Sequence, residues 1–409
     1  MKALSTLLLT ALLLASLIVP TASVTSQPEK VKVIIGFHGR PDANIVKGLG
    51  GEVRHVYTVI DAIAASLPEP AVERLRVHPR VRYVEMDAVA YILGKPSRPP
   101  KPPTQDTETV PWGIVKVEAP KVWSTYGDTG EAIRVAVIDT GIDTDHPDLA
   151  GNIKGGVCYK LGLGYPYGSY DDDNGHGTHC AGIVAAIDNT IGVVGVAPKV
   201  YLYAVKVLNA QGQGYYSDVI AGIEWCITNG MQVGSMSFGG PDYSQALYDV
   251  CVQAYCAGIV LVAAAGNTGG AVIYPAKLSY GHTVIAVGAT CRNDSVASWS
   301  SREWASTDRP YVTVVAPGVE VYSTYKGGTY LTASGTSMAC PHVTGTVALM
   351  LKKDPSLITK KTSDNYGPFT TYHVEQILEQ TAWVPTGYTK PDIAYGWGIV
   401  NASAAVGAA

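Results

Sequence analysis

Residues 133–141 read Ile-Arg-Val-Ala-Val-Ile-Asp-Thr-Gly, a short apolar run that ends in an acid and a glycine turn. Because the run is rich in β-branched residues and has the length of a strand, it predicts a buried strand over 133–138. Similar runs alternate with helical patterns: strands over 200–207, 232–237, 259–265 and 283–289, and helices over 176–187, 218–228, 243–257 and 337–353. This alternation predicts an α/β fold with a mainly parallel sheet between helices. Asp139 then stands at the carboxyl end of a strand, where such sheets carry their chemistry.

Three short segments each present one member of an acid, base and nucleophile set: Asp139-Thr140-Gly141, His176-Gly177-Thr178-His179 and Gly335-Thr336-Ser337-Met338-Ala339. A serine hydroxyl needs an adjacent base, and that base needs an orienting carboxylate. His176 and Ser337 both begin predicted helices, where unpaired backbone N–H groups stabilise negative charge. The chain order Asp, His, Ser differs from that of α/β-hydrolases, and Ala339 breaks the GxSxG pattern. An esterase of that class is therefore disfavoured.

The composition sets limits on partners and on covalent chemistry. Of 409 residues, 47% are hydrophobic and 16% are charged, and the net charge is −4 with no basic stripe. These values predict a large buried core and argue against a nucleic-acid partner. Seven cysteines permit disulfides but leave at least one thiol unpaired, and no spacing typical of a zinc site occurs.

Composition also divides the chain into segments. An apolar N-terminal stretch with a basic start predicts a signal peptide over 1–24 and secretion. A transmembrane anchor is the alternative, although the stretch is barely long enough. Residues 25–93 show strands and helices in β-α-β-β-α-β order, with the last strand over 81–93, which predicts a ferredoxin-like α+β unit. A proline-rich linker over 94–109 leads into 110–409, which holds all three segments.

Six stretches carry a resemblance to a known family: Val137-Ile138-Asp139-Thr140-Gly141-Ile142-Asp143, His146-Pro147-Asp148-Leu149, His176-Gly177-Thr178-His179, Ser237-Phe238-Gly239-Gly240, Ala265-Gly266-Asn267 and the Ser337 motif with Cys340-Pro341-His342-Val343. From about Val110 to Ala405 the chain resembles a subtilisin-family serine protease precursor. Its linker and its Val110-Pro111-Trp112-Gly113 segment are similar to subtilisins of hyperthermophilic archaea. The resemblance implies a subtilisin-like three-layer fold and a secreted, monomeric serine endopeptidase that cuts polypeptides through an acyl-enzyme. A catalytically inactive, peptide-binding relative is the alternative.

The same resemblance assigns the substrate cleft. It implies that Asn267 is the oxyanion-hole side chain, acting with the backbone N–H of Ser337. An extended substrate would pair with two edge strands. The implied substrate-binding residues are Gly212, Gly214, Tyr216, Ser237, Phe238, Gly239, Ala265, Gly266 and Ile273. We expect Ile273 to make the primary pocket apolar and shallow. The neighbouring His179, His342, Cys180 and Cys340 are expected to be structural.

A calcium ion is a further implication of the resemblance. The loop that starts at Ile187 is similar to the calcium loop of subtilisins, and calcium takes several oxygen ligands. The expected ligands are Glu108, Asp148, Ile187, Asn189, Ile191 and Val193. Glu108 stands where the family usually has Gln. The acidic run 171–173 is expected to be a solvated turn.

The resemblance finally implies a role for residues 25–93 as an inhibitor I9-type propeptide. This unit would act as an intramolecular inhibitor and folding chaperone, with its tail 91–93 in the cleft. Cleavage is expected between Leu93 and Gly94, with a second trimming near 105–109. After signal removal no membrane contact is expected. An accessory binding domain is the alternative for this unit.

Overall fold

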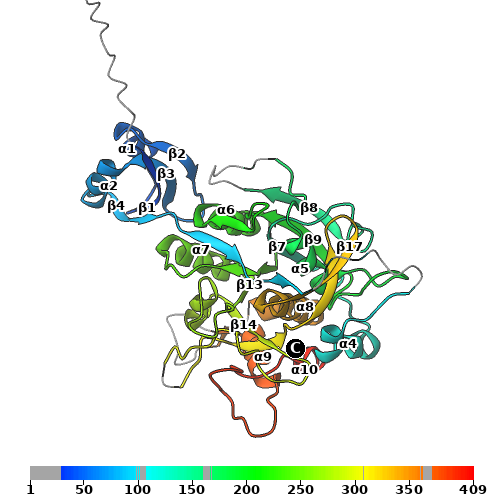
Figure 1. Cartoon of the computed structure of the whole chain (residues 1–409). Coiled ribbons are helices and arrows are strands. Elements are labelled where there is room, and N and C mark those ends of the chain that lie inside the picture. Colours follow the sequence, from blue (N-terminus) through cyan, green and yellow to red (C-terminus); the bar gives the residue numbers. More distant parts are fainter. Residues whose placement is uncertain are drawn as a thin grey trace, which may run out of the picture.

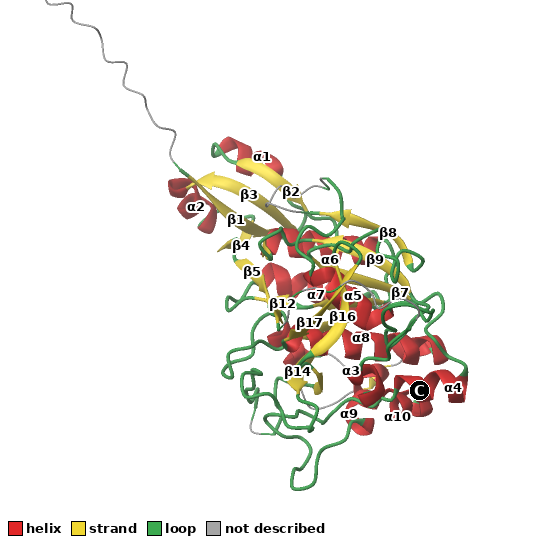
Figure 2. Cartoon of the chain, turned by 45° about the vertical axis from the view of Figure 1, so that its right-hand side comes forward, coloured by secondary structure: helices red, strands yellow, loops and turns green. Residues whose placement is uncertain are grey.

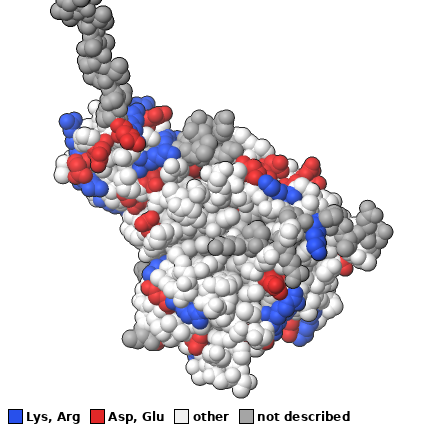
Figure 3. All heavy atoms as spheres, in the orientation of Figure 1, with Lys and Arg blue, Asp and Glu red and all other residues white. Residues whose placement is uncertain are grey.

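The computed structural model describes residues 29–97, 99, 101, 107–159, 166, 168–306, 308–359, 361–362 and 371–409. The predicted signal peptide and parts of the predicted linker lie outside these residues. Within them, no helix is both long enough and apolar enough to cross a membrane. Figure 1 shows a small N-terminal unit, in blue, beside a large unit that contains the rest of the chain. Charged side chains gather on the N-terminal unit, whereas the visible face of the large unit is mostly uncharged (Figure 3).

The N-terminal unit is a four-stranded antiparallel sheet with two helices. Its strands are ordered β2-β3-β1-β4: β1 (Lys30–Phe37), β2 (Glu52–Val56), β3 (Ala62–Pro68) and β4 (Val81–Met86). Helices α1 (Ala43–Gly48) and α2 (Glu69–Arg76) share a core with alternate strand residues such as Val33 and Ile35. The residues between them, such as Ile34, join the core of the large unit instead. Strand alternation thus gives this sheet one face for its own helices and one face for docking.

The predicted single strand over 81–93 is wrong. The chain leaves the small sheet after Met86, and β5 (Val89–Ile92) lies in a different sheet, between β10 (Gln213–Tyr215) and β12 (Phe238–Gly239). The reason is tertiary, because the Asp87 side chain at the break bonds to Ser217 of the large unit.

A seven-stranded parallel sheet forms the centre of the large unit, as predicted. Its strands are ordered β15-β14-β13-β11-β7-β9-β8: β7 (Arg134–Asp139), β8 (Ile153–Cys158), β9 (Tyr201–Lys206), β11 (Val233–Met236), β13 (Val260–Ala264), β14 (Ile285–Thr290) and β15 (Val314–Pro317). Strand β7 lies between β11 and β9, so the apolar run predicted as a strand over 133–138 forms an interior strand of the sheet. That position explains its continuous apolar character.

Helices cover both faces of this sheet, which gives the predicted three-layer fold. Val135 and Val137 of β7 share a core with α5 (His176–Ala185) and α8 (Thr336–Lys353). Ala136 and Ile138, on the opposite face, share a core with α6 (Tyr216–Thr228) and α7 (Gln245–Cys256). The docking face of the N-terminal sheet joins this second core, beside α6 and α7 (Figure 1).

The remaining elements surround these layers. A fourth sheet has the order β16-β17-β6: β6 (Lys95–Pro96), β16 (Val321–Tyr325) and β17 (Thr329–Ser334). The short or peripheral elements are α3 (Trp112–Lys116), α4 (Ala119–Tyr126), η1 (Ala276–Gly281), η2 (Pro355–Ile358), β18 (Lys361–Thr362), β19 (Thr371–Tyr372), α9 (His373–Thr381) and α10 (Ala402–Ala408). Among the described residues, which include all seven cysteines, there is no disulfide bond.

Candidate active site

Asp139 and His176 meet inside the large unit. Asp139 is the last residue of β7 and His176 is the first residue of α5. The His176 Nδ1 atom lies 2.8 Å from Asp139 Oδ1, and the Thr140 N–H donates to the same oxygen at 2.7 Å. A Cβ on Gly177 would collide with the carbonyl oxygen of Gly141, so the helix start needs glycine to come this close. The acid is therefore fixed against one nitrogen of the imidazole.

Ser337 lies at the start of α8 and is fully buried. Its hydroxyl donates to the carbonyl oxygen of Ser237 at 2.7 Å. The His176 Nε2 atom, which would accept the serine proton, has no hydrogen-bond partner among the described residues. Gly94 lies against that nitrogen, since a Cβ on Gly94 would be 3.0 Å from it. The hydrogen bond between serine and histidine that a triad needs is therefore not formed in this state.

Burial and the neighbouring acid act in opposite directions on His176. Burial lowers the pKa of His176, but the charge and hydrogen bond of Asp139, together with the contributions of Cys180, outweigh it and raise this pKa well above the usual value. The two other histidines on these helices behave differently. Burial lowers the pKa of His179 to about 3 and that of His342 to about 4. Both are bound to backbone carbonyls, His179 to Leu331 and His342 to Met338, which is the expected structural role.

Two cysteines lie close to these residues. The Cys180 Sγ atom is 3.9 Å from His176 Nδ1, and the Cys340 thiol faces the carbonyl oxygen of Val262 at 3.4 Å. Burial raises the pKa of both thiols, that of Cys340 to about 12. Thiolate is the nucleophilic form, so burial disfavours a nucleophilic role for both thiols. They pack as small buried side chains, as predicted.

Asn267 lies beside the carbonyl group of Leu93. Its Nδ2 donates to the Leu93 oxygen, while its Oδ1 accepts from the backbone N–H and the hydroxyl of Thr336, both at 2.9 Å. These two bonds fix which way the amide faces. A Cβ on Gly335 would collide with the Leu93 oxygen, so this glycine allows the carbonyl to approach. The site thus has a positioned donor at one carbonyl oxygen.

The segment before Leu93 forms β5, the middle strand of the three-stranded sheet β10-β5-β12. Strand β5 pairs antiparallel with β10, where Ala90 faces Gly214, and with β12, where Tyr91 faces Gly239. Figure 2 shows β5 beside β12. The Ile92 N–H also donates to the Gly212 carbonyl at 3.0 Å. Four of the residues predicted to bind an extended substrate therefore hold the chain's own residues 90–92: Gly212, Gly214, Phe238 and Gly239.

The predicted pocket residues lie next to this strand. A Cβ on Gly239 would come 2.6 Å from Ile273 Cδ1, and a Cβ on Gly266 would come 3.4 Å from Ile273 Cγ1. The Ile273 side chain therefore fills the space beside both glycines, and its backbone N–H bonds to the Ala265 carbonyl at 3.1 Å. Tyr216 is 1% exposed, and its hydroxyl donates to the Asp242 carbonyl at 3.1 Å.

The segment after Leu93 is also bound, which sequence reasoning missed. Lys95 and Pro96 pair antiparallel with Ser334 and Ala333 of β17. A proline-rich composition predicts an exposed spacer, and it carries no signal that distinguishes a docked spacer from a free one. The first part of the predicted linker is therefore a strand of the large unit.

Hydrogen bonds connect the three segments that carry the predicted calcium ligands: Glu108, Asp148 and the loop 187–193. Asp148 is fully buried, and its carboxylate accepts from Asn189 Nδ2 at 2.7 Å, Val193 N at 2.9 Å and Tyr330 Oη at 3.0 Å. Glu108 accepts from the Asn189 N–H at 2.6 Å. Ile187 is linked through its N–H to the Asp148 carbonyl at 2.9 Å, and the Ile191 N–H donates to Asn189 Oδ1 at 2.7 Å.

This loop fits a calcium ion by its chemistry. Burial raises the pKa of Glu108, and the nearby Asp188 and Asp148 carboxylates raise it further. Burial likewise raises the pKa of Asp148. Carboxylate, amide and carbonyl oxygens are the ligands that calcium prefers, and a divalent cation would offset the repulsion between these acids.

Two acids of the N-terminal unit cap helices of the large unit. Asp87 accepts from the Ser217 N–H at 2.9 Å near the start of α6, and it forms a buried ion pair with Arg54 at 2.7 Å. Glu85 accepts from the Gln245 N–H at 2.8 Å at the start of α7. Helix N-termini favour negative charge. Sequence reasoning missed these residues, because acids at alternate positions of a strand do not indicate a partner helix.

Glu224 makes a second contact between the units. Its carboxylate lies 2.8 Å from His55 Nε2 and accepts from the Thr58 hydroxyl at 2.7 Å and from the Val59 N–H at 3.0 Å. Burial raises the pKa of Glu224, but the hydrogen bonds from His55 and Thr58 outweigh it and lower the pKa below its usual value. The ionised carboxylate is therefore the form that holds the N-terminal unit.

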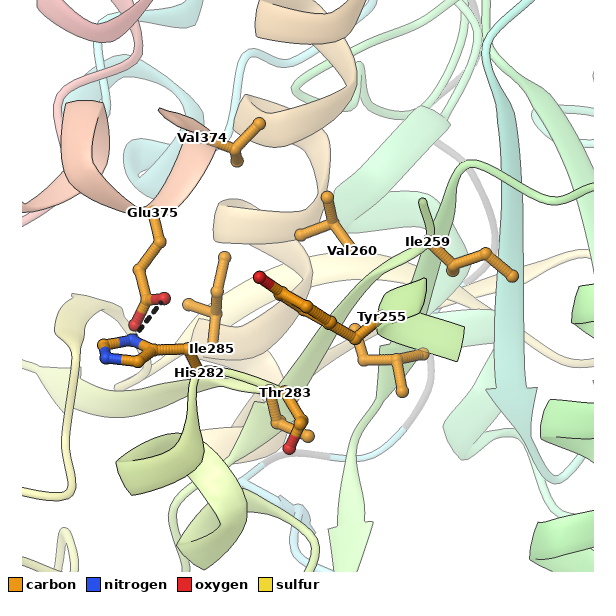
Figure 4. Close-up of a pocket in the computed structure, with 10 residues that line it drawn as sticks. Tyr255, Ile259, Val260, His282, Thr283, Ile285, Val374 and Glu375 are labelled. Atoms are coloured by element: carbon orange, nitrogen blue, oxygen red, sulfur yellow. Dashed lines mark hydrogen bonds and ion pairs between the residues drawn. The ribbon is translucent and has the colours of Figure 1, made fainter. Parts of the chain in front are cut away.

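A buried cluster of charged residues elsewhere contains none of the predicted site residues. The Glu375 carboxylate lies 3.0 Å from His282 Nδ1 and 3.1 Å from Arg309 Nη2. Figure 4 shows Glu375 and His282 beside a cavity that Tyr255 and Thr283 also line. The cavity holds about 10 Å³, room for one water molecule. We interpret this cluster as the anchor of α9.

Comparison with known proteins identifies the family. Residues 130–398 match the subtilase family, Peptidase S8. Subtilisin E of Bacillus subtilis (strain 168) is 41% identical over 396 residues, which cover 94% of this chain and 92% of that protein. M-protease of Shouchella clausii (strain KSM-K16) is 41% identical over 355 residues, covering 87% of this chain and 81% of the relative. Subtilisin DY of Bacillus licheniformis is 49% identical over 255 residues, covering 61% and 87% respectively.

The chain therefore belongs to the subtilase family, the class of α/β serine proteases to which the subtilisins belong. This membership supports serine-type endopeptidase activity on polypeptide substrates.

Proposed function

We propose that the chain is the precursor of a secreted serine endopeptidase. In this proposal Asp139, His176 and Ser337 form the catalytic triad and Asn267 completes the oxyanion hole. The observation that carries it is the Leu93 carbonyl group, which lies against Gly335 at the start of α8 and accepts from Asn267 Nδ2. A peptide bond held in this way is a substrate in place. The processed enzyme is proposed to act as a monomer.

In the proposed reaction the serine hydroxyl turns from the Ser237 carbonyl toward the imidazole. His176 Nε2 takes the proton while Ser337 Oγ attacks the carbonyl carbon of Leu93. The negative charge on the Leu93 oxygen is stabilised by Asn267 Nδ2 and the Ser337 N–H. His176 then gives the proton to the nitrogen of Gly94, the bond breaks, and the acyl-enzyme is hydrolysed by water that His176 deprotonates. Asp139 stabilises the imidazolium in both steps.

Residues 25–93 are proposed to remain bound as an inhibitor after this cleavage. The helix-capping acids Glu85 and Asp87, and β5 between its two neighbouring strands, support this role. A large parallel sheet folds slowly because its contacts are non-local, which gives a template of this kind a physical purpose. The I9-type assignment of this unit and the affinity to subtilisins of hyperthermophilic archaea are predictions of the same proposal.

Calcium is the proposed cofactor. Glu108, Asp148 and Asn189 would hold it with their side chains, and Ile187, Ile191 and Val193 with their carbonyl oxygens. Bound there, the ion would link the end of the linker, through Glu108, to Asp148 and to the loop after α5, and so stabilise the folded state.

The deciding experiment compares the wild-type precursor with Ser337→Ala. We expect wild-type material to begin at Gly94, to react with a fluorophosphonate probe and to hydrolyse casein, and Ser337→Ala to stay uncut and unlabelled. N-terminal sequencing and probe fluorescence are the measurements. A cut that persists in purified Ser337→Ala would refute self-processing. Processed protein that neither reacts with the probe nor hydrolyses casein would instead favour the inactive, peptide-binding alternative.

A further inference from the structure

Lys206 is a fully buried lysine that takes no part in the proposed reaction. It is the last residue of β9, and its side chain is 1% exposed. The ammonium group donates to Asp173 Oδ1 at 2.6 Å, to the Leu208 carbonyl oxygen at 3.0 Å and to the Thr140 carbonyl oxygen. A lysine ammonium carries three protons, so these three acceptors use all of them.

The three acceptors belong to three different segments of the chain. Thr140 follows β7, Leu208 follows β9, and Asp173 precedes α5. Taking an ammonium group out of water is costly, and a buried ion pair often stabilises a fold less than well-packed apolar side chains would. Stability alone therefore gives no reason for a lysine at this position, whereas a fixed arrangement of the three segments does.

Thr140 connects the proposed acid to the helix of the proposed base. Its N–H donates to Asp139 Oδ1 at 2.7 Å, and its hydroxyl accepts from the Gly177 N–H at 2.9 Å, directly after His176. The carbonyl group of the same residue is bound by Lys206. A shift of Thr140 would therefore move the carboxylate relative to the imidazole, and Lys206 opposes such a shift.

Asp173 carries the same ammonium contact to the other side of the pair. It lies three residues before His176, which is the first residue of α5. The chain between them is bonded to the helix start, because the His176 N–H donates to Asn174 Oδ1 at 3.1 Å. Lys206 thus holds the chain after the acid and the chain before the base at one point.

We propose that Lys206 is a positioning residue for the Asp139–His176 pair. By fixing the segments on both sides, it keeps the carboxylate and the imidazole at their distance of 2.8 Å and in their relative direction while the proton moves. This inference rests on the proposed function, because it assigns Lys206 to the proposed triad. A misplacement of about 1 Å can slow an enzyme about 10²-fold.

The first test measures the kinetics of the processed protein on a small chromogenic peptide. Lys206→Met keeps the length of the side chain and removes its three donors. We expect kcat to fall about 10- to 100-fold and KM to change less than about 2-fold, because the residues that bind the peptide are unchanged. The matched control is Lys199→Met, which removes a surface ion pair with Glu131 just before β9 and should leave both constants unchanged.

A second pair of variants decides the question if Lys206→Met does not fold. Asp173→Ala removes one of the three acceptors from a side chain that is 39% exposed, so folding should be retained. We expect kcat to fall about 2- to 10-fold, the loss typical of one hydrogen bond. Asp173→Asn keeps an oxygen that can accept and should recover most of this loss. A wild-type kcat in Asp173→Ala overturns the proposal.

A spectroscopic measurement separates a positioning role from a purely structural one. In the Ser337→Ala precursor, the proton between His176 Nδ1 and Asp139 should give a low-field NMR resonance. Adding Lys206→Met should shift or broaden this resonance, and adding Lys199→Met should not. If Lys206→Met folds, an unchanged resonance or an unchanged kcat overturns the proposal, even where the Tm falls.

The same resonance distinguishes failure of this inference from failure of the proposed function. Wild-type protein that neither reacts with the fluorophosphonate probe nor cleaves the peptide overturns the proposed function. The resonance does not depend on activity, so a shift caused by Lys206→Met would still support the positioning of the pair. An unchanged resonance in active protein overturns this inference alone.

Discussion

Strand β5, before the Leu93–Gly94 bond, pairs with two strands of the large unit, whereas β6, after the bond, pairs with one. The two sides also differ in burial, because Ala90 is fully buried and Ser97 is exposed. The contacts of Asp87 with Ser217 and of Glu224 with residues of the N-terminal unit add to the binding of β5. Cutting the bond should therefore release the side with one neighbour first, and leave the other side bound as an inhibitor.

Asp87→Ala should have the largest effect, and it should weaken the binding of the segment before the Leu93–Gly94 bond. The substitution removes the ion pair between Asp87, whose side chain is 0% exposed, and Arg54, whose side chain is 7% exposed, and it removes the cap of α6. Breaking a buried pair in this way costs about 3–5 kcal/mol. We expect the lag between cleavage at Leu93 and the appearance of activity to shorten, which a small chromogenic substrate measures.

The matched control is Glu73→Ala, which removes an ion pair with Arg76 on the exposed surface of the same unit. Exposed pairs contribute little, so its lag should equal that of the wild type. An unchanged lag in Asp87→Ala would contradict the account of this interface.

Asn267→Ala should slow cleavage of the Leu93–Gly94 bond, and the segments before and after this bond should stay bound. Loss of one oxyanion donor costs about 2.7–4 kcal/mol, a magnitude established on a subtilisin, which corresponds to about 10²- to 10³-fold in rate. The rate of precursor disappearance on a gel measures this effect. Thr336→Val is the comparison, because it removes one of the two bonds to Asn267 Oδ1 and should cost less. Equal rates for wild type and Asn267→Ala would exclude Asn267 as a donor.

Calcium removal should weaken the binding of the segment after the Leu93–Gly94 bond. The reason is that Asp148, a proposed ligand, accepts a hydrogen bond from Tyr330 at one end of β17. A ligand at 100 times its Kd stabilises by about 2.7 kcal/mol, so a chelator should lower the Tm of the processed protein. Glu108→Gln should show a smaller chelator effect, and Asp171→Asn, outside the loop, should respond like the wild type. If the chelator changes no Tm, the ion does not bind there.

The pH dependence of processing should report on His176. The base must be neutral to accept the serine proton, and the Asp139 carboxylate raises its pKa well above the usual value. The rate of self-cleavage should therefore rise with pH through a value above 6.5, and fall as His176 becomes protonated below it. His179 and His342, with pKa values of about 3 and about 4, stay neutral across this range. A rate that is already maximal at pH 6 would disagree with this assignment.

Much of the fold could be predicted because it depends on local pattern. The apolar run at 133–138 became the interior strand β7, and the helices that begin at His176 and near Ser337 lie as expected. The break between β4 and β5 at Asp87 could not be predicted, because the segments on both sides of it have strand character. Only the contact between Asp87 and α6 distinguishes the two strands from one continuous strand. The docked linker was missed for the same reason, since its partner β17 is more than 200 residues away in sequence.

The sequence by itself determined the parallel α/β core, the residues that can act as acid, base and nucleophile, and their order along the chain. Side-chain periodicity and residue chemistry are local properties, so they can be recognised in the sequence without knowledge of the contacts between distant residues. Only the tertiary structure decided that Ser337 bonds to Ser237 rather than to His176, and that residues 89–97 occupy both sides of the cleft. These outcomes depend on which strand edges and helix ends come together from distant parts of the chain. Such long-range pairings produce no periodic pattern in the sequence.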